Sequence, residues 1–297
     1  MFIFLVIPAN IYIFPNFSKL YFAKIIFFYM FVVQILNNFL MKPGKDIPDS
    51  DEIFSRSRLL LGDETMRRLA STKVILFGAG GVGSWAAEAL IRTGIGYLDI
   101  VDHDRIDPSN INRQAEALVP TIGLPKAETL ASRLREVNPK AKINAISQRY
   151  CQETAQSFSL DSYDYVLDAI DSLGDKALLI LNACQSQAKL FASMGAALKI
   201  DPSKIRTAEF WHVEGCPLAA ALRHRFRRLA MASGLSTKEV PAKKFLCVYS
   251  PELIRNPDTK PSPSQDNKAP NGSLVHITAI FGLTLASLVI QDIIGVR

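Results

Sequence analysis

The sequence predicts an α/β protein with a Rossmann-like, mostly parallel sheet and helices on both faces. Three observations predict this fold. A short apolar run at residues 73–77 is followed at once by GAGGVG at residues 78–83, which matches G-x-G-x-x-G. Apolar side chains then recur at helical spacing over residues 84–92, and residues 97–102 form a second apolar run that ends in an acid. Strand, glycine turn, helix and strand in this order are typical of a nucleotide-binding βαβ unit.

Composition narrows the class of protein. The 297-residue chain is 48% hydrophobic and 21% charged, which excludes disorder as its main state. Its four cysteines, Cys151, Cys184, Cys216 and Cys247, include no C-x-x-C pair, so we expect no structural zinc and no disulfide framework. Cys184 and Cys216 are expected in the core or at a helix start, because free cysteine usually behaves as a small buried hydrophobe.

Residues 1–40 differ from the rest of the chain. They contain no acid, only Lys19 and Lys24 as charges, and nine of the 17 phenylalanines. We favour an extension outside the working protein, with a start at Met41. A membrane anchor through the uncharged run 25–41 stays an alternative, and a cleaved signal peptide fits less well because no basic start precedes the apolar run. We expect a cytoplasmic active site, with membrane contact depending on residues 1–40.

The second half predicts an extension of the sheet. Alternating residues over 198–210 predict a pair of antiparallel strands with a turn at residues 201–203, and residues 217–231 predict an amphipathic helix. Residues 269–291 are uncharged and long enough to span a membrane, but their polar residues favour a buried C-terminal helix that covers the sheet.

The residues after the second strand favour ATP over a dinucleotide. Asp102, at the strand end, is placed to accept hydrogen bonds from a ribose. Asn110, Arg113 and Lys126 follow within about 25 residues. A hydride-transferring enzyme has no need of this amide and these two cations there, whereas an enzyme that handles a triphosphate does.

A later strand also ends in acids. Residues 165–167 lead into Asp168-Ala169-Ile170-Asp171, and acids at the carboxyl end of a parallel strand point into the ligand crevice. Asp171 is placed to hold Mg²⁺, a hard cation that prefers carboxylate oxygen. Asp168 has the alternative of capping the next helix.

These motifs resemble the ubiquitin-activating-enzyme-like adenylating family, which includes the adenylyltransferases of thiamine and molybdopterin synthesis. The matching segments, in order, are GAGGVG, IVDHD, SNINRQ, GLPK and LDAID. Within that family the chain most resembles the tRNA threonylcarbamoyladenosine dehydratases, through GSWAAEALIRTGIG at residues 83–96, residues 216–223 and residues 247–252. The resemblance covers about residues 54–292.

The resemblance implies that ATP adenylates a threonylcarbamoyl carboxylate on tRNA, which then cyclises with net loss of water. Arg113, Lys126 and Asp171 would be catalytic, with Mg²⁺ on Asp171. An upstream arginine, Arg58 or Arg56, resembles the one that reaches into a partner subunit's site, which implies a homodimer. The implied ATP contacts are Gly78, Gly80, Gly81, Gly83, Asp102, Asp104, Asn110, Arg113, Lys126, Asp171 and Arg58.

A basic cluster between residues 223 and 244 is expected to contact the tRNA anticodon loop, since clustered positive charge is typical of a phosphate-backbone partner. His224, Phe226 and Phe245 lie among these charges as candidates for stacking on unpaired bases. A solvated helix face is the alternative. The candidate basic contacts are Arg223, Arg225, Arg227, Arg228, Lys243 and Lys244.

The chain is therefore divided into an N-terminal extension (1–40), a helical arm (41–72), an ATP-binding core (73–195) and an extension with a basic helix and a C-terminal helix (196–297). Three other functions stay open. One is an adenylyltransferase for a small sulfur-carrier or ubiquitin-like protein, with a sulfur-transfer or carrier protein as partner. The others are an NAD-dependent oxidoreductase and a membrane-tethered scaffold without activity.

Overall fold

The computed structural model describes residues 2–7, 10–15, 49–237, 239–256 and 271–296. The chain divides into two compact units, Met1–Pro48 and Asp49–Arg297. In the first, β1 (Phe2–Ile7) pairs with β2 (Asn10–Pro15) as an antiparallel hairpin. The anchor proposed for residues 25–41 lies outside the described residues, as do residues 257–270. The four-part division of the chain stays a prediction.

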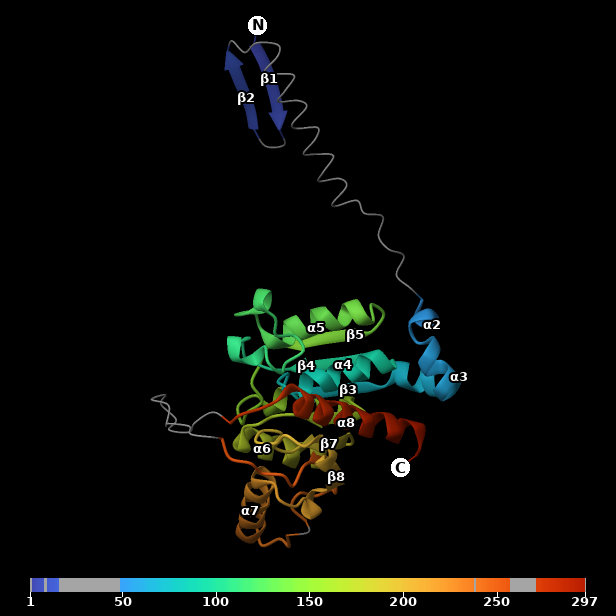
Figure 1. Ribbon diagram of the computed structural model, residues 1–297, viewed down its shortest axis with the longest axis vertical. Coiled ribbons are helices and arrows are strands. Elements are labelled where there is room, and N and C mark those ends of the chain that lie inside the picture. Colours follow the sequence, from blue (N-terminus) through green and yellow to red (C-terminus); the bar gives the residue numbers. More distant parts are fainter. Residues whose placement is uncertain (1, 8–9, 16–48, 238, 257–270, 297) are drawn as a thin grey trace, which may run out of the picture. The chain divides into compact units, whose positions relative to one another are not determined.

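One seven-stranded sheet runs through the second unit in the order β5-β4-β3-β6-β7-β9-β8 (Figure 1). All neighbouring strands are parallel except β8, which runs antiparallel to β9 at the edge. The predicted mostly parallel sheet is confirmed. The strands are β3 (Lys73–Phe77), β4 (Tyr97–Val101), β5 (Lys142–Ile146), β6 (Tyr165–Asp168), β7 (Lys189–Ser193), β8 (Arg206–Glu209) and β9 (Leu246–Tyr249).

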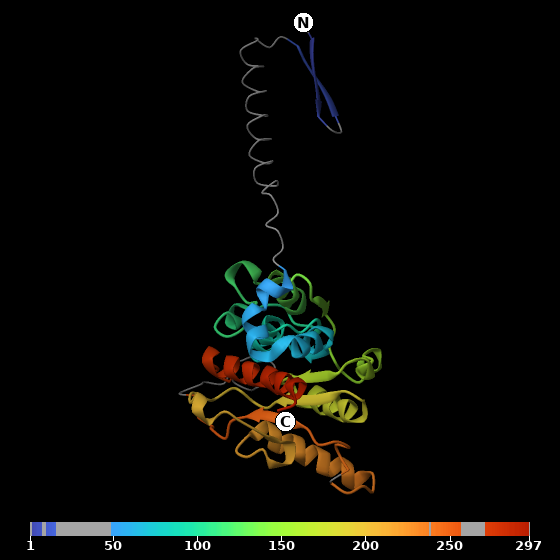
Figure 2. The same ribbon diagram turned by 90° about the vertical axis from the view of Figure 1, so that its right-hand side faces the viewer.

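Helices cover both faces of this sheet, as predicted (Figure 2). Val74 and Leu76 of β3 face a core shared with α3, α4, α5 and α8, while Ile75 and Phe77 face a core shared with α6 and α7. The helices are α2 (Ser50–Ile53), α3 (Ser55–Ser71), α4 (Gly83–Thr93), α5 (Lys126–Val137), α6 (Leu173–Gln185), α7 (Pro217–Ala232) and α8 (Val275–Ile294). Short 3-10 turns lie at Pro108–Asn110, Val119–Thr121, Ala155–Ser157, Leu160–Ser162, Pro202–Lys204 and Phe210–His212.

The antiparallel strand pair predicted over residues 198–210 is wrong. Only Arg206–Glu209 forms a strand, and its partner is β9, about 40 residues later in the chain. The Asp201 side chain accepts from the Ser203 backbone N–H, and a 3-10 turn follows at Pro202–Lys204. Proline has no N–H to donate to a ladder, so the apolar alternation before it does not become a strand.

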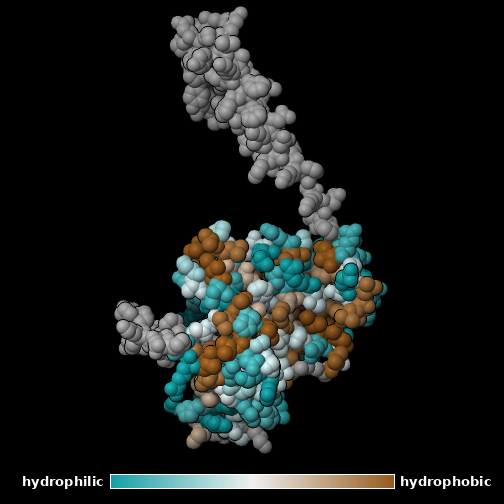
Figure 3. Space-filling model, in the orientation of Figure 1, coloured by the Kyte–Doolittle hydropathy of each residue, from teal (hydrophilic) through white to brown (hydrophobic). Residues whose placement is uncertain are grey.

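The C-terminal helix α8 is buried against the sheet, as predicted. Ile277, Phe281 and Leu285 are fully buried, and α8 packs on α4 at Gly282, where a Cβ atom would lie 2.3 Å from the Val82 carbonyl oxygen. Among the described helices α8 is long and apolar enough to cross a membrane, yet half of that stretch is buried in the protein. Its outward side is also apolar, with Leu283 47% exposed, and Figure 3 shows brown surface over α8.

The strand order creates a crevice. The chain moves from β3 to β4 and β5 on one side of the sheet, and returns to β6 and β7 on the other. Neighbouring parallel strands whose connections diverge leave room between the loops at their carboxyl ends. The loop after Phe77 therefore lies beside the loop after Asp168, its register partner.

Candidate active site

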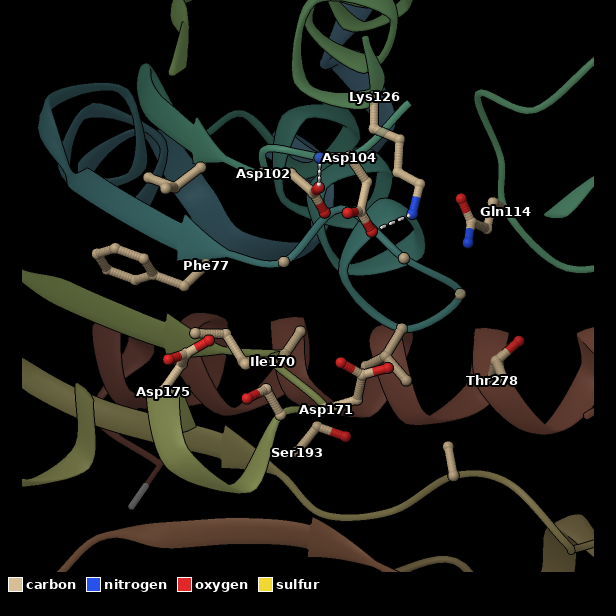
Figure 4. A pocket seen from close by; sticks show the side chains of 18 of the residues that line it. Phe77, Asp102, Asp104, Gln114, Lys126, Ile170, Asp171, Asp175, Ser193 and Thr278 are labelled. Carbon is tan, nitrogen blue, oxygen red and sulfur yellow. Dashed lines mark hydrogen bonds and ion pairs between the residues drawn. The ribbon is translucent and has the colours of Figure 1, made fainter. Parts of the chain in front are cut away.

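A cavity of about 560 Å³ lies at the carboxyl ends of β3, β4 and β6 (Figure 4). It brings together predicted site residues from five separate segments of the chain, and further segments complete its lining. The predicted site residues that line it are Gly78, Gly80, Gly81, Asp102, Asp104, Asn110, Arg113, Lys126 and Asp171. Gly83 and Arg58 are not among its lining residues.

The four glycines of the turn differ in their surroundings, and a Cβ atom at Gly81 would lie 3.1 Å from Arg113 and 3.2 Å from Thr278. A Cβ atom at Gly83 would lie 1.8 Å from the Gly78 carbonyl oxygen, and one at Gly78, where φ is +95°, would lie 2.7 Å from the Ala169 carbonyl oxygen. These two glycines allow the turn to close against α4 and the β6 loop. At Gly80 a Cβ atom would meet only the Gln114 amide nitrogen, at 3.9 Å. The backbone at Gly80 therefore faces the cavity at the start of α4, where free N–H groups suit an anion.

Asp102 and Asp104 form an acidic edge beside the glycine turn. The Asp102 carboxylate accepts from the backbone N–H groups of Ala79 (2.7 Å) and Asp104 (2.8 Å). Lys126, at the start of α5, has a side chain only 9% exposed and pairs with Asp104 at 2.9 Å. Ligand atoms of Asp102, His103 and Asp104 lie within 4.8 Å of one another, a spacing that a cation can bridge.

Arg113 and Asn110 occupy the loop before α5. Asn110 is buried, and its side-chain oxygen accepts from the Asp107 backbone N–H in a capping box. Arg113 donates to the carbonyl of Ser109 at 2.8 Å, while Trp85 of α4 donates to the Arg113 carbonyl at 2.9 Å. The loop is thus anchored on α4, with the guanidinium at the cavity wall.

A buried ion pair supports the loop that carries Asp171. Asp168 and Lys176 are both fully buried and 2.9 Å apart, and Lys176 also donates to the Ile170 carbonyl at 2.9 Å. Burial raises the pKa of Asp168, and Lys176 opposes that rise. The helix α6 begins only at Leu173, so the alternative of Asp168 as its cap is wrong. Asp171 itself is exposed in the cavity across from Asp104 and Lys126 (Figure 4).

Several lining residues carried no sequence signal. Arg149, after β5, pairs with Asp175 of α6 at 2.8 Å, and both line the cavity. Gln114, beside Arg113, also lines the cavity, and Ser193 and Thr278 line it from two further segments. Gln114 lies in the quoted SNINRQ motif, but nothing in the sequence distinguished it from its neighbours.

The upstream arginines lie elsewhere. Arg58 pairs with Asp51 and with Asp63, the latter at 2.6 Å, within the α2–α3 arm. It lines a small cavity with Gly96 and Tyr97 at the amino end of β4, the opposite end of the strands from the large cavity. Arg56 is exposed on α3.

The expectation for the cysteines is confirmed. Cys184 in α6 and Cys216, directly before α7, are both buried. Burial raises the pKa of the Cys184 thiol to about 11 and that of Cys247 well above its usual value. A thiol held protonated is a poor nucleophile.

For Phe226 and Phe245 the predicted stacking on unpaired bases is wrong, whereas His224 is exposed. Phe226 is fully buried and Phe245 is 5% exposed, and both pack on Phe210 in the core. On α7 the 3.6-residue period turns Phe226 inward while its charged neighbours face out. Neither ring can stack on a base.

A prediction follows from Glu116, which is 1% exposed and has no hydrogen-bond partner for either carboxylate oxygen among the described residues. Burial raises its pKa to about 8. Between pH 4.5, the pKa of Glu116 in the unfolded chain, and pH 8, Glu116 is protonated in the folded state and ionised in the unfolded state. The free energy of unfolding therefore falls as pH rises through this window. In urea unfolding, the free energy of unfolding of Glu116→Gln should equal that of the wild type at pH 5. At pH 9 it should be larger by up to about 5 kcal/mol. A difference independent of pH would contradict this assignment.

Comparison with known proteins agrees with this geometry. The ThiF family's sequence model matches residues 54–296. A tRNA threonylcarbamoyladenosine dehydratase of Bacillus subtilis (strain 168) is 32% identical over 247 residues, 81% of this chain and 94% of that protein. The tRNA threonylcarbamoyladenosine dehydratase of Escherichia coli (strain K12) is 33% identical over 79% of this chain and 90% of its own length. A crystal structure of the E. coli enzyme, TcdA, in complex with ATP matches with a TM-score of 0.73 and 32% identity, over 84% of this chain and 97% of that one. The chain therefore belongs to the ThiF family.

Proposed function

We propose that the chain is an ATP-dependent tRNA threonylcarbamoyladenosine dehydratase. One observation carries the proposal: the cavity at the switch point of the sheet joins the glycine turn, the Asp104–Lys126 pair, Arg113 and Asp171. The relatives of Bacillus subtilis and Escherichia coli, which match this chain over 94% and 90% of their own length, are named for this activity. A crystal structure of the E. coli enzyme is in complex with ATP.

The reaction has two steps that balance. The carboxylate oxygen of the threonylcarbamoyl group attacks the α-phosphorus of ATP. The bond from that phosphorus to the oxygen that bridges it to the β-phosphate breaks, and pyrophosphate leaves with the bridging oxygen. An atom of the same side chain then attacks the activated carbonyl carbon, AMP leaves, and a proton is lost, so that one water is removed in total. Ring closure within one bound substituent needs no protein nucleophile, because the attacking atom is already at high effective concentration. The buried cysteines agree with this.

Each lining group has a role set by its charge. The backbone at Gly80 and Gly81 approaches the phosphates, and Asp102 accepts from the ribose hydroxyls. Asn110 and Arg113 contact the triphosphate, and Lys126 stabilises charge on the departing pyrophosphate. Lys126 is already paired with Asp104, so the arriving phosphate competes for an ammonium that is held in place. Gly78 and Gly83 shape the turn, and of these two only Gly78 lines the cavity.

The residues also fit Mg²⁺. Asp171 is exposed to the cavity and, within the described part of the chain, no hydrogen bond or ion pair occupies its carboxylate. Its oxygens, with those of Asp104 across the cavity, suit a hard cation. Bound there, Mg²⁺ would neutralise phosphate charge.

A homodimer would complete the site. Arg58 lies at the amino end of the strands, away from its own cavity, so it would act in the cavity of a second copy. Leu59 and Leu60 next to it are 85% and 84% exposed, and the outward side of α8 is apolar, which supports burial against another subunit. A tRNA substrate implies a cytoplasmic body, while membrane contact through residues 1–40 stays a prediction.

The test uses the full chain with ATP, Mg²⁺ and tRNA that carries threonylcarbamoyladenosine. Mass spectrometry of the digested nucleosides should show the loss of one water, only when ATP is present. Unchanged nucleosides under conditions where the protein binds ATP would reject the proposal. Pyrophosphate exchange driven by a small protein ending in Gly-Gly would support the carrier adenylyltransferase instead, and preference for NAD over ATP would revive the oxidoreductase.

A further inference from the structure

A second hollow, of about 910 Å³, lies between α6 and α7, which pack side by side (Figures 1 and 2). We call it the α6–α7 groove. Its apolar floor is formed by leucines, of which Leu173 and Leu229 are 37% and 40% exposed. The other lining residues are Gln152, Gly174, Asp175, Ala177, Leu178, Leu181, Ala221, His224, Arg225, Phe226 and Arg228.

The groove adjoins the ATP cavity. Asp175 lines both hollows, and its partner Arg149 lines the cavity only. The two hollows therefore meet at Asp175, and a polymeric substrate bound in the cavity would extend toward the groove.

The arginines of α7 divide into two sets by their contacts. Arg223 donates to the carbonyls of Phe210 and Val213, at 3.3 and 2.8 Å, and Arg227 lies 5.5 Å from the centre of the Trp211 ring. Both are held by their own chain. Arg225 and Arg228 line the groove, are exposed, and have no hydrogen bond or ion pair with any residue that the structure describes.

The geometry points to the α6–α7 groove as the site that holds the tRNA nucleotide next to the modified adenosine. This inference rests on the proposed function and names the surface through which its substrate binds. Arg225 and Arg228 would contact backbone phosphates, because free guanidinium groups at a groove rim match phosphate in charge and geometry. The leucine floor and the exposed His224 would receive an unstacked base, as apolar and aromatic surfaces do in single-stranded RNA recognition.

Single variants on α7 test the rim. The probe is tRNA carrying threonylcarbamoyladenosine, titrated into the full chain at several salt concentrations. Arg225→Ala and Arg228→Ala should each weaken binding about fivefold, or about 1 kcal/mol, and lower the salt slope by about one. Arg206→Ala, which removes the same charge from the exposed start of β8 outside the groove, is the matched control and should stay near wild type. Equal losses in all three would mean only a general charge effect and would overturn the assignment.

A variant without a charge change tests the floor. A Cβ atom at Gly174 would meet nothing within 4 Å, so Gly174→Leu should fold and fill the groove mouth. It should raise the KM for tRNA several-fold while the affinity for ATP and the salt slope stay unchanged. Wild-type tRNA affinity in Gly174→Leu would refute the base site.

Failure of the inference and failure of the proposed function remain distinct. If the wild type removes water from the modified nucleoside but the Arg225, Arg228 and Gly174 variants bind tRNA normally, the groove is rejected and the function stands. If the wild type binds ATP but leaves the nucleoside unchanged, the function is rejected whatever the variants do.

Discussion

An Asp171→Ala enzyme should keep its fold and lose turnover by about 10²-fold or more, which is what removal of one charge-stabilising group in an active site costs. Asp171 lies exposed in the cavity, across from Asp104 and Lys126 (Figure 4). No described residue depends on its carboxylate, so unfolding in urea should change by no more than about 0.5 kcal/mol. The measurement is the rate of ATP-dependent water loss at several Mg²⁺ concentrations.

Two variants make this result specific. Asp171→Asn keeps the size and removes the charge, and it should be nearly as slow as Asp171→Ala. Glu136→Ala removes an exposed acid of α5 outside the cavity, and it should turn over at the wild-type rate. Near-normal turnover of Asp171→Ala would show that the carboxylate has no part in the reaction.

Lys176→Met should destabilise the fold by about 3–5 kcal/mol, because it leaves the Asp168 carboxyl buried without its cation. The two groups are 2.9 Å apart and both fully buried, and the substitution also removes the donor to the Ile170 carbonyl. Burial already raises the pKa of Asp168, and without Lys176 its carboxyl would take up a proton in the folded state. The loss in the free energy of unfolding should therefore grow as pH rises. Urea unfolding at pH 6 and pH 8 measures both effects.

The double variant Asp168→Asn/Lys176→Met separates the ion pair from the packing. The double variant removes both charges, so its free energy of unfolding should lie between that of Lys176→Met and that of the wild type. Asp168→Asn alone leaves the Lys176 ammonium buried and unpaired. Lys176→Met should also slow turnover where it remains folded, since the pair supports the loop that carries Asp171. A loss below about 1 kcal/mol in Lys176→Met would contradict the structural role of the pair.

Local patterns predicted most of the nucleotide end. The glycine turn, α4 and β3 were identified because apolar period and glycine position act over a few residues. The strand pair at residues 198–210 failed because its alternation is a local signal, while the true partner of β8 lies in β9. The stacking of Phe226 and Phe245 failed because neighbouring charges do not reveal which way a ring points.

The amino-acid pattern specifies the order of strand, glycine turn, helix and acid, and hence the class of ligand that binds at the carboxyl edge. The packing of the fold sets which of these residues meet. It separated Arg58 from the cavity, joined Arg149 to Asp175 and Asp168 to Lys176, and opened a groove beside Arg225 and Arg228. The reason is physical: backbone propensity depends on near neighbours, whereas side-chain burial and charge pairing depend on segments that only the packed sheet brings together.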